Sequence, residues 1–95
     1  MHVVVRSYSG QGAAELFDLL GKRGDDVNSL ISGVPGFVSY SAFRSSGDTG
    51  MTVTTCQDRA GTDESSRRAA GWVKENVGAP VDPPTITEGD TFLQF

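Results

Sequence analysis

The side chains with the most chemistry to offer are aromatic and basic, and they are spread along the whole sequence. A tryptophan can stack on a flat ligand and donate its indole N–H, and a tyrosine can donate a phenolic proton. An arginine can hold an anionic group through paired hydrogen bonds. These residue types could hold a small aromatic or anionic molecule, and Trp72, Tyr40, Arg6 and Tyr8 are the candidate ligand-binding residues.

Each candidate also has a structural interpretation, and the sequence leaves both open. Trp72 can fill the core between a helix and a sheet, and strand tyrosines such as Tyr8 and Tyr40 often serve packing alone. Arg44 lies beside a predicted turn and fits the surface. Arg6 is different, because its strand is expected at the centre of the sheet. A buried guanidinium there needs a carboxylate partner or a bound anion.

Other kinds of chemistry find no support in the residue pattern. Cys56 is the only cysteine and His2 the only histidine, so the sequence offers no nearby thiol–imidazole pair and no cluster of metal ligands. The Gly-Gln-Gly run at 10–12 lacks the third glycine of a dinucleotide-binding turn, and we interpret it as a helix entry. We therefore assign no catalytic residue and expect neither a metal nor a cofactor.

Length and charge limit the class of protein. Ninety-five residues suit a single domain spanning 1–95. The net charge of −4 argues against nucleic acid as a partner, because clustered Lys and Arg supply most of that affinity. No apolar run is long enough for a membrane span, and the first residues show no signal peptide. We expect a cytoplasmic protein.

The hydrophobic pattern predicts strands and helices in the order β-α-β-β-α-β. Val-rich residues 2–8 predict a first strand, and an apolar stripe from Ala13 to Val34 predicts one long helix. A hairpin follows at 37–45 and 51–57, then a helix with Thr62 as its N-cap, and a last strand at 85–95 with a kink at 88–90. This order predicts an α+β, ferredoxin-like βαββαβ fold, with a four-stranded antiparallel sheet and both helices on one face.

Pairing Ala42 with Val53 and Arg44 with Met51 divides the hairpin into two faces. The face predicted to lie under the helices carries Val38, Tyr40, Ala42, Met51, Val53 and Thr55. The opposite face carries Phe37, Ser39, Ser41, Phe43, Thr52, Thr54 and Cys56. Because the first and last strands offer apolar residues to both faces, we expect the open face to pack on a second copy of the chain as a homodimer.

The element order, the VPGFVSYSAFRS entry to the second strand and the DRAGTDESSRRAAGWVKEN loop and helix resemble the dimeric α/β barrel superfamily. The nearest relatives look like small antibiotic-biosynthesis-monooxygenase-like domains. The resemblance implies two sheets paired into a closed barrel, with a cavity between sheet and helices. Haem-degrading members use an Asn near the end of strand 1, a helical Trp and a downstream His. Only Trp72 could match them, so haem is not expected.

The resemblance and the residues together support two functions. One is a small dimeric protein that binds an aromatic or anionic metabolite. The alternative is a cofactor-independent monooxygenase acting on an aromatic or quinol-like substrate, in which the substrate's electron-rich ring reacts with oxygen while the pocket stabilises a developing anion. Whether the chain is an enzyme is open at this point.

Overall fold

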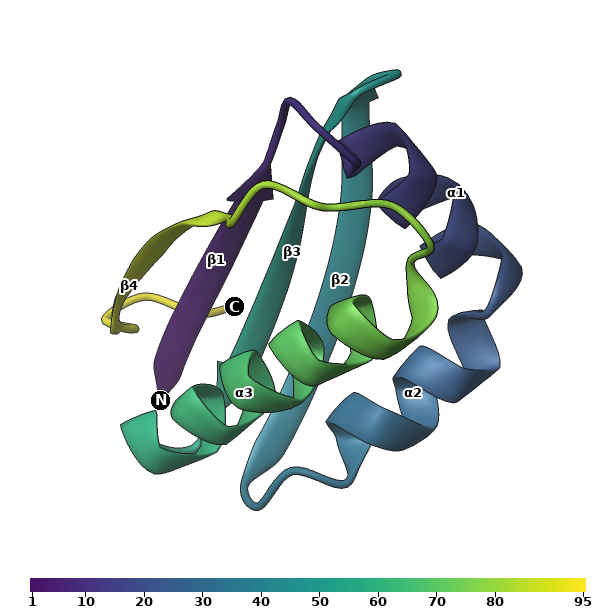
Figure 1. Ribbon diagram of the computed structural model, residues 1–95. Helices are drawn as coiled ribbons and strands as arrows, with labels where there is room; N and C mark the ends of the chain where they lie inside the picture. Colours follow the sequence, from purple (N-terminus) through teal and green to yellow (C-terminus); the bar gives the residue numbers. More distant parts are fainter.

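The structure is a computed structural model that describes residues 1–95, and it confirms the predicted ferredoxin-like α+β fold (Figure 1). Its strands form one sheet in the order β2-β3-β1-β4, and every neighbouring pair is antiparallel. All three helices cover the same face of this sheet, as Figure 1 shows. The elements are β1 (His2–Tyr8), α1 (Ala13–Lys22), α2 (Gly24–Ser32), β2 (Phe37–Ser46), β3 (Thr49–Cys56), α3 (Arg59–Asn76) and β4 (Thr85–Asp90).

The central strand β1 is apolar on both of its faces, as its run of valines predicts. Burial alternates strictly along it: His2, Val4, Arg6 and Tyr8 are buried, while the residues between them are half-buried. Successive strand residues point to opposite faces. The four buried side chains therefore lie under the helices, and Val3, Val5 and Ser7 lie on the open face.

The prediction of one long helix over 13–34 is wrong, because the chain forms α1 and α2 with a break at Arg23. Arg23 has φ −117° and ψ 38°, outside the helical region. Its guanidinium lies 5.6 Å from the centre of the Trp72 ring and donates to Asn76 Oδ1 at 2.6 Å. Contacts with α3 thus favour a break that the flanking Gly21 and Gly24 make easy.

The predicted hairpin register is wrong by one residue on β3. Ala42 pairs with Thr52 and Arg44 with Gly50, and the register shifts twice along β2, between Phe37 and Ser39 and between Arg44 and Ser46. A one-residue slip moves a strand's whole side-chain set to the other face. The side chains of β3 are therefore reversed from the prediction: Thr52, Thr54 and Cys56 are buried under the helices, and Met51, Val53 and Thr55 lie on the open face.

Two further boundaries differ from the sequence prediction. Helix α3 begins at Arg59, and its N-cap is Asp58, whose carboxylate accepts the N–H of Gly61 at 3.1 Å, whereas Thr62 was the predicted cap. Strand β4 ends at Asp90 and pairs with β1 without a kink, so residues 91–95 lie beyond it. The side chain of Phe92 is 92% exposed there.

The main core lies between the sheet and the helices. Its buried members come mostly from α1, α2 and the ends of the sheet, and they are Tyr8, Ala13, Leu16, Phe17, Val27, Ile31 and Trp72. Gly50 belongs to this packing, because a Cβ placed there would lie 2.5 Å from the Phe17 ring. No helix is both long and apolar enough to span a membrane.

Candidate functional site: a cavity beneath helix α3

A cavity of about 610 Å³ lies between β1, α3 and the connector that leads to β4. Its walls are largely apolar, and its polar groups include Arg6 and Tyr8, both from β1. The chain elements that enclose it are distant in sequence and meet because β4 lies beside β1 while α3 crosses above. The wall residues used below are Ser66, Ala70, Val73, Lys74, Val77, Val81, Asp82 and Ile86.

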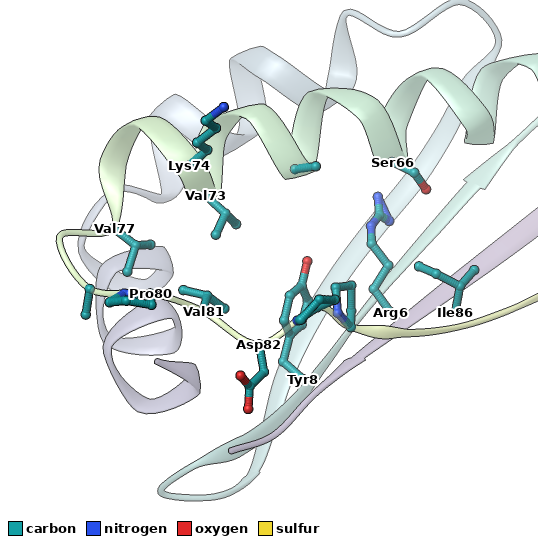
Figure 2. Close-up of a pocket in the computed structure, with 14 residues that line it drawn as sticks. Arg6, Tyr8, Ser66, Val73, Lys74, Val77, Pro80, Val81, Asp82 and Ile86 are labelled. Carbon is teal, nitrogen blue, oxygen red and sulfur yellow. The ribbon is translucent and has the colours of Figure 1, made fainter. Parts of the chain in front are cut away.

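Arg6 and Tyr8 reach the cavity because they are two residues apart on one strand, which puts both on the helix-covered face of β1. Figure 2 shows the Arg6 guanidinium and the Tyr8 hydroxyl projecting from the strand toward α3. Tyr8 is held by an edge-on contact with Phe17, with ring centres 6.0 Å apart and an interplanar angle of 74°. The two predicted residues therefore lie together at the floor of the cavity.

Arg6 is only 1% exposed and has no carboxylate partner. Nη1 and Nη2 each donate to Thr54 Oγ1 at 3.2 Å, and Nη2 also donates to Ser65 Oγ at 3.2 Å. Its Nε is buried without any hydrogen-bond partner. A charge taken out of water without an opposite charge or a full set of hydrogen bonds is costly. Of the two partners that the sequence predicts for Arg6, the carboxylate is absent.

The titration behaviour of the site follows from its burial. Burial lowers the pKa of the Arg6 guanidinium, although an arginine stays charged at any ordinary pH. Burial raises the pKa of the Tyr8 phenol, and the nearby Arg6 charge opposes part of that rise. Tyr8 is therefore a neutral hydroxyl at neutral pH, able to donate one hydrogen bond. The site as a whole offers a fixed positive charge beside a phenolic donor.

The connector that closes the cavity is fastened to the turn after β1. The N–H of Gln11 donates to Asp82 Oδ2 at 3.0 Å, and the N–H of Asp82 donates to the Gln11 carbonyl oxygen at 2.9 Å. Gly12 has a φ of +81°, and a Cβ there would lie 2.3 Å from the carbonyl oxygen of Pro80. The Gly-Gln-Gly run is thus a helix entry, as predicted, and its glycines also let the connector pack closely.

Trp72 and Tyr40 lie outside this cavity. Trp72 is 9% exposed and packs in the main core, and the space that it lines together with Tyr40 measures about 20 Å³, room for about one water. Little space remains between Trp72 and Tyr40, because α1 and α2 pack there, whereas Tyr40 also lines a separate space of about 340 Å³ between α2 and β2. Tyr8 and Val73 border both spaces, so Tyr8 separates the cavity beside Arg6 from the core around Trp72 and Tyr40.

Sequence reasoning missed Thr54 and Ser65, which hold the guanidinium of Arg6. The predicted register placed Thr54 on the open face, and that register was wrong. The alternation of residues along β3 does not by itself say which set of side chains lies under the helices. Ser65 had a visible signal, because counting back from Trp72 by three and four residues along the helix reaches Ala69, Ser65 and Thr62. Hydroxyls on the inward stripe of a helix indicate a polar group beneath it.

Comparisons with known proteins agree on the fold. A protein of unknown function from Nitrosomonas europaea, NE2512, matches with a TM-score of 0.71 at 20% identity, over 99% of this chain and 90% of that one. The monooxygenase ActVA-Orf6 of Streptomyces coelicolor, solved with nanaomycin D, matches with a TM-score of 0.71 at 18% identity, over 99% and 89%. SnoaB, a cofactor-independent oxygenase from Streptomyces nogalater solved as a mutant, matches with a TM-score of 0.60 at 16% identity, over 99% and 94%.

No family model matches the sequence, and no curated protein matches it. Identities this low carry the fold alone, and the functions of these neighbours do not transfer with it. The resemblance predicted from the sequence is confirmed at that level, since another neighbour is itself described as an antibiotic biosynthesis monooxygenase. The chain shares its ferredoxin-like fold with these solved structures, some of which are described as monooxygenases.

Proposed function

We propose that this protein binds a small aromatic or anionic metabolite in the cavity beneath α3. The observation that carries the proposal is a space of about 610 Å³ with apolar walls and two polar side chains at its floor. Small-molecule sites in proteins have this size, and a few polar groups in an apolar lining fix the ligand's orientation. The fold neighbour solved with nanaomycin D supports a small-molecule role.

In this proposal Arg6 and Tyr8 contact the ligand directly. Tyr40 and Trp72 act behind them, because both pack in the core cluster that contains Tyr8 and so hold its ring in place. A change at Trp72 would then alter the ligand's affinity through the position of Tyr8. No metal takes part in the proposal. The structure contains no group of three or more His, Cys, Asp or Glu side chains arranged to hold one.

Filling the cavity tests the proposal. Ala70 lines the cavity from α3, and Ala70→Phe would occupy part of it. With 2-naphthol as the probe, we expect amide chemical-shift changes at Val77 and Val81 in the parent protein and their loss in Ala70→Phe. The matched control is Ala14→Phe on the exposed side of α1, which should bind as the parent does. Shifts that survive Ala70→Phe, or that map to another region, would contradict a cavity site.

A homodimer through the open face belongs to the same proposal. That face combines half-exposed Val3, Val5, Met51 and Val53 with Phe43, which is 50% exposed. It is more apolar than the sequence predicted, because the corrected register moves Thr52 and Thr54 beneath the helices. A contiguous apolar sheet face is typical of a protein interface, and a second copy offers a matching surface.

A second candidate function is cofactor-independent monooxygenation of an aromatic or quinol-like substrate. A fold neighbour described as a cofactor-independent oxygenase favours it, together with two hydrogen-bond donors, Arg6 and Tyr8, placed to stabilise a developing anion. In the overall reaction the substrate loses two hydrogens and gains one atom of O₂, and the other atom leaves as water. Oxygen uptake with an aromatic quinol, abolished in Arg6→Met, would support it. Equal uptake by both proteins would contradict it.

We also propose a cytoplasmic location. Cys56 is a buried free thiol, and single unpaired cysteines are typical of a reducing compartment. The net negative charge leaves nucleic acid out of the proposed partners.

A further inference from the structure

The hydrogen bonds of Arg6 leave part of its guanidinium unused. A guanidinium carries five N–H donors, and those of Arg6 make three bonds, two to Thr54 and one to Ser65. These bonds fix the plane of the group and leave Nε buried without a partner. Burial raises the pKa of the nearby titratable side chains Tyr8, Tyr40 and Cys56, so they are neutral at neutral pH, and no carboxylate forms an ion pair with Arg6. The guanidinium is therefore held rigidly, fully charged and without a counter-ion.

The other charged residues of the cavity do not compensate for Arg6. Figure 2 shows the Lys74 ammonium on the far side of α3 from the cavity, and the Asp82 carboxylate directed away from Arg6. The Asp82 carboxylate is already used, since it accepts the N–H of Gln11 at 3.0 Å. Figure 2 shows Ser66 and Ile86 as the labelled wall residues beside the guanidinium, with Val73 and Val77 farther along the cavity, and none of the four carries a charge. One uncompensated positive charge thus sits at the end of an apolar space.

We infer that the ligand of this cavity is an organic monoanion, a carboxylic acid with an apolar body, whose carboxylate oxygen accepts the Arg6 Nε–H. The inference rests on the proposed function and narrows its ligand class. Because Nε is buried, a small shift of the Arg6 side chain accompanies binding. The Tyr8 hydroxyl is placed to donate a second hydrogen bond. The apolar walls favour a hydrocarbon body and disfavour a second charge at the other end.

Two probes of equal size test the charge requirement. The anion 2-naphthoate and the neutral 2-naphthamide differ only in replacing a carboxylate with a carboxamide. In calorimetric titrations near neutral pH, we expect the parent protein to bind 2-naphthoate at least about tenfold more tightly, since a charge-assisted hydrogen bond replaces a neutral one. The dianion 2,6-naphthalenedicarboxylate should bind more weakly than 2-naphthoate, because its second carboxylate would meet apolar walls.

Variants test whether Arg6 causes the preference for 2-naphthoate over 2-naphthamide. Arg6→Met should bind both naphthalene probes with equal affinity, and Arg6→Lys should lose most of the preference because it lacks Nε and the planar fork. The matched control is Arg44→Met, which removes an exposed arginine that bonds Asp18 and should keep the preference. The comparison in the parent protein needs no variant, so it stands even if Arg6→Met does not fold.

The outcomes separate this inference from the proposed function. Equal affinity of the parent protein for 2-naphthoate and 2-naphthamide would overturn the inference while leaving a cavity for neutral ligands. That result is also expected if a buried water satisfies Nε. A preference that persists in Arg6→Met would overturn the assignment to this residue. Failure of both probes and of 2-naphthol to bind would contradict the proposed function itself.

Discussion

Nη2 of Arg6 on β1 lies 3.2 Å from Oγ of Ser65 on α3, and this pair is a polar link between the sheet and the helix that covers it. The Ser65 hydroxyl in turn donates to the Thr62 carbonyl oxygen at 2.6 Å, so its lone pairs face the guanidinium. Both residues are almost completely buried. The link fixes where the Arg6 charge lies relative to the cavity.

Ser65→Ala should destabilise the protein by about 1–3 kcal/mol, because it leaves a further N–H donor of Arg6 without a partner in a buried site. Urea unfolding measures the change. The control is Ser66→Ala at the next position of α3, which removes a hydroxyl that makes no hydrogen bond in the structure and should change stability by less than about 0.5 kcal/mol. Similar costs at both positions would show that the loss is not specific to the link with Arg6.

The same link predicts non-additivity with Arg6. Replacing an unpaired buried charge with an apolar side chain is neutral or stabilising, so Arg6→Met should leave the free energy of unfolding unchanged or raise it by up to about 2 kcal/mol. In the Arg6→Met background, Ser65→Ala should then cost little. A double-mutant cycle by urea unfolding measures this coupling. If the changes in unfolding free energy are additive, Ser65 stabilises the protein through a contact other than the one with Arg6.

Replacing two glycines of α3 with alanine should change the stability of the protein in opposite directions. A Cβ at Gly61 would lie 2.6 Å from the Pro35 carbonyl oxygen and 2.8 Å from Cys56 Cβ, whereas a Cβ at Gly71 would meet nothing within 4 Å. Gly61→Ala should therefore cost about 1–3 kcal/mol through overpacking. Gly71→Ala should stabilise the helix by about 0.5–1 kcal/mol. Thermal unfolding compares the two, and a stabilised Gly61→Ala would refute the close approach of α3 to β3.

Stability should fall as pH rises past neutrality, because of His2. Its Nε2 lies 2.9 Å from Glu88 Oε1 and its Nδ1 3.1 Å from Asp90 Oδ1, both on β4. The hydrogen bond to Glu88, followed by that to Asp90, raises the pKa of the His2 imidazole. A group whose pKa is raised on folding stabilises fully below its unfolded pKa of about 6.5 and loses that effect as pH rises through the folded pKa.

The test is urea unfolding at several pH values from about 6 to about 8.5, the range in which histidine titrates when its pKa is raised. Unfolding free energy should decline across this range in the parent protein. His2→Gln keeps a hydrogen-bonding side chain that cannot titrate, so its curve should be flatter. Parallel curves for the two proteins would rule out His2 as the source of the decline.

A charge on the open face should separate the proposed homodimer. Val53 lies on that face, paired with Val5 on one side and Ser41 on the other. Val53→Lys should yield a monomer by light scattering at micromolar concentration, because each copy would bury an unpaired ammonium. Glu75→Lys on the exposed surface of α3 controls for adding a lysine and should stay dimeric. A monomeric parent protein would contradict the dimer outright.

Much of the fold could be predicted because it depends on local patterns. The Val run predicted β1, the β-rich runs at 37–45 and 51–57 predicted the hairpin of β2 and β3, and the apolar stripe from Ala13 to Val34 predicted helix there, although not its division into α1 and α2. Their order determines the ferredoxin-like topology. The central position of β1, and with it the burial of Arg6, follows from that topology alone.

Features that depend on a strand shift of one residue, or on contacts between distant segments, could be learned only from the tertiary structure. The register of β3 put Thr54 rather than Val53 beneath the helices, and so placed an acceptor within reach of Arg6. Contacts of Arg23 with Trp72 and Asn76 favour the break between α1 and α2, and core residues of these two helices pack around Trp72. The connector left a cavity on the other side of Tyr8. The sequence alone indicates that a buried arginine needs a partner. Only the packing of distant segments determines that Arg6 Nε has no partner within the chain and that a cavity lies beside this side chain.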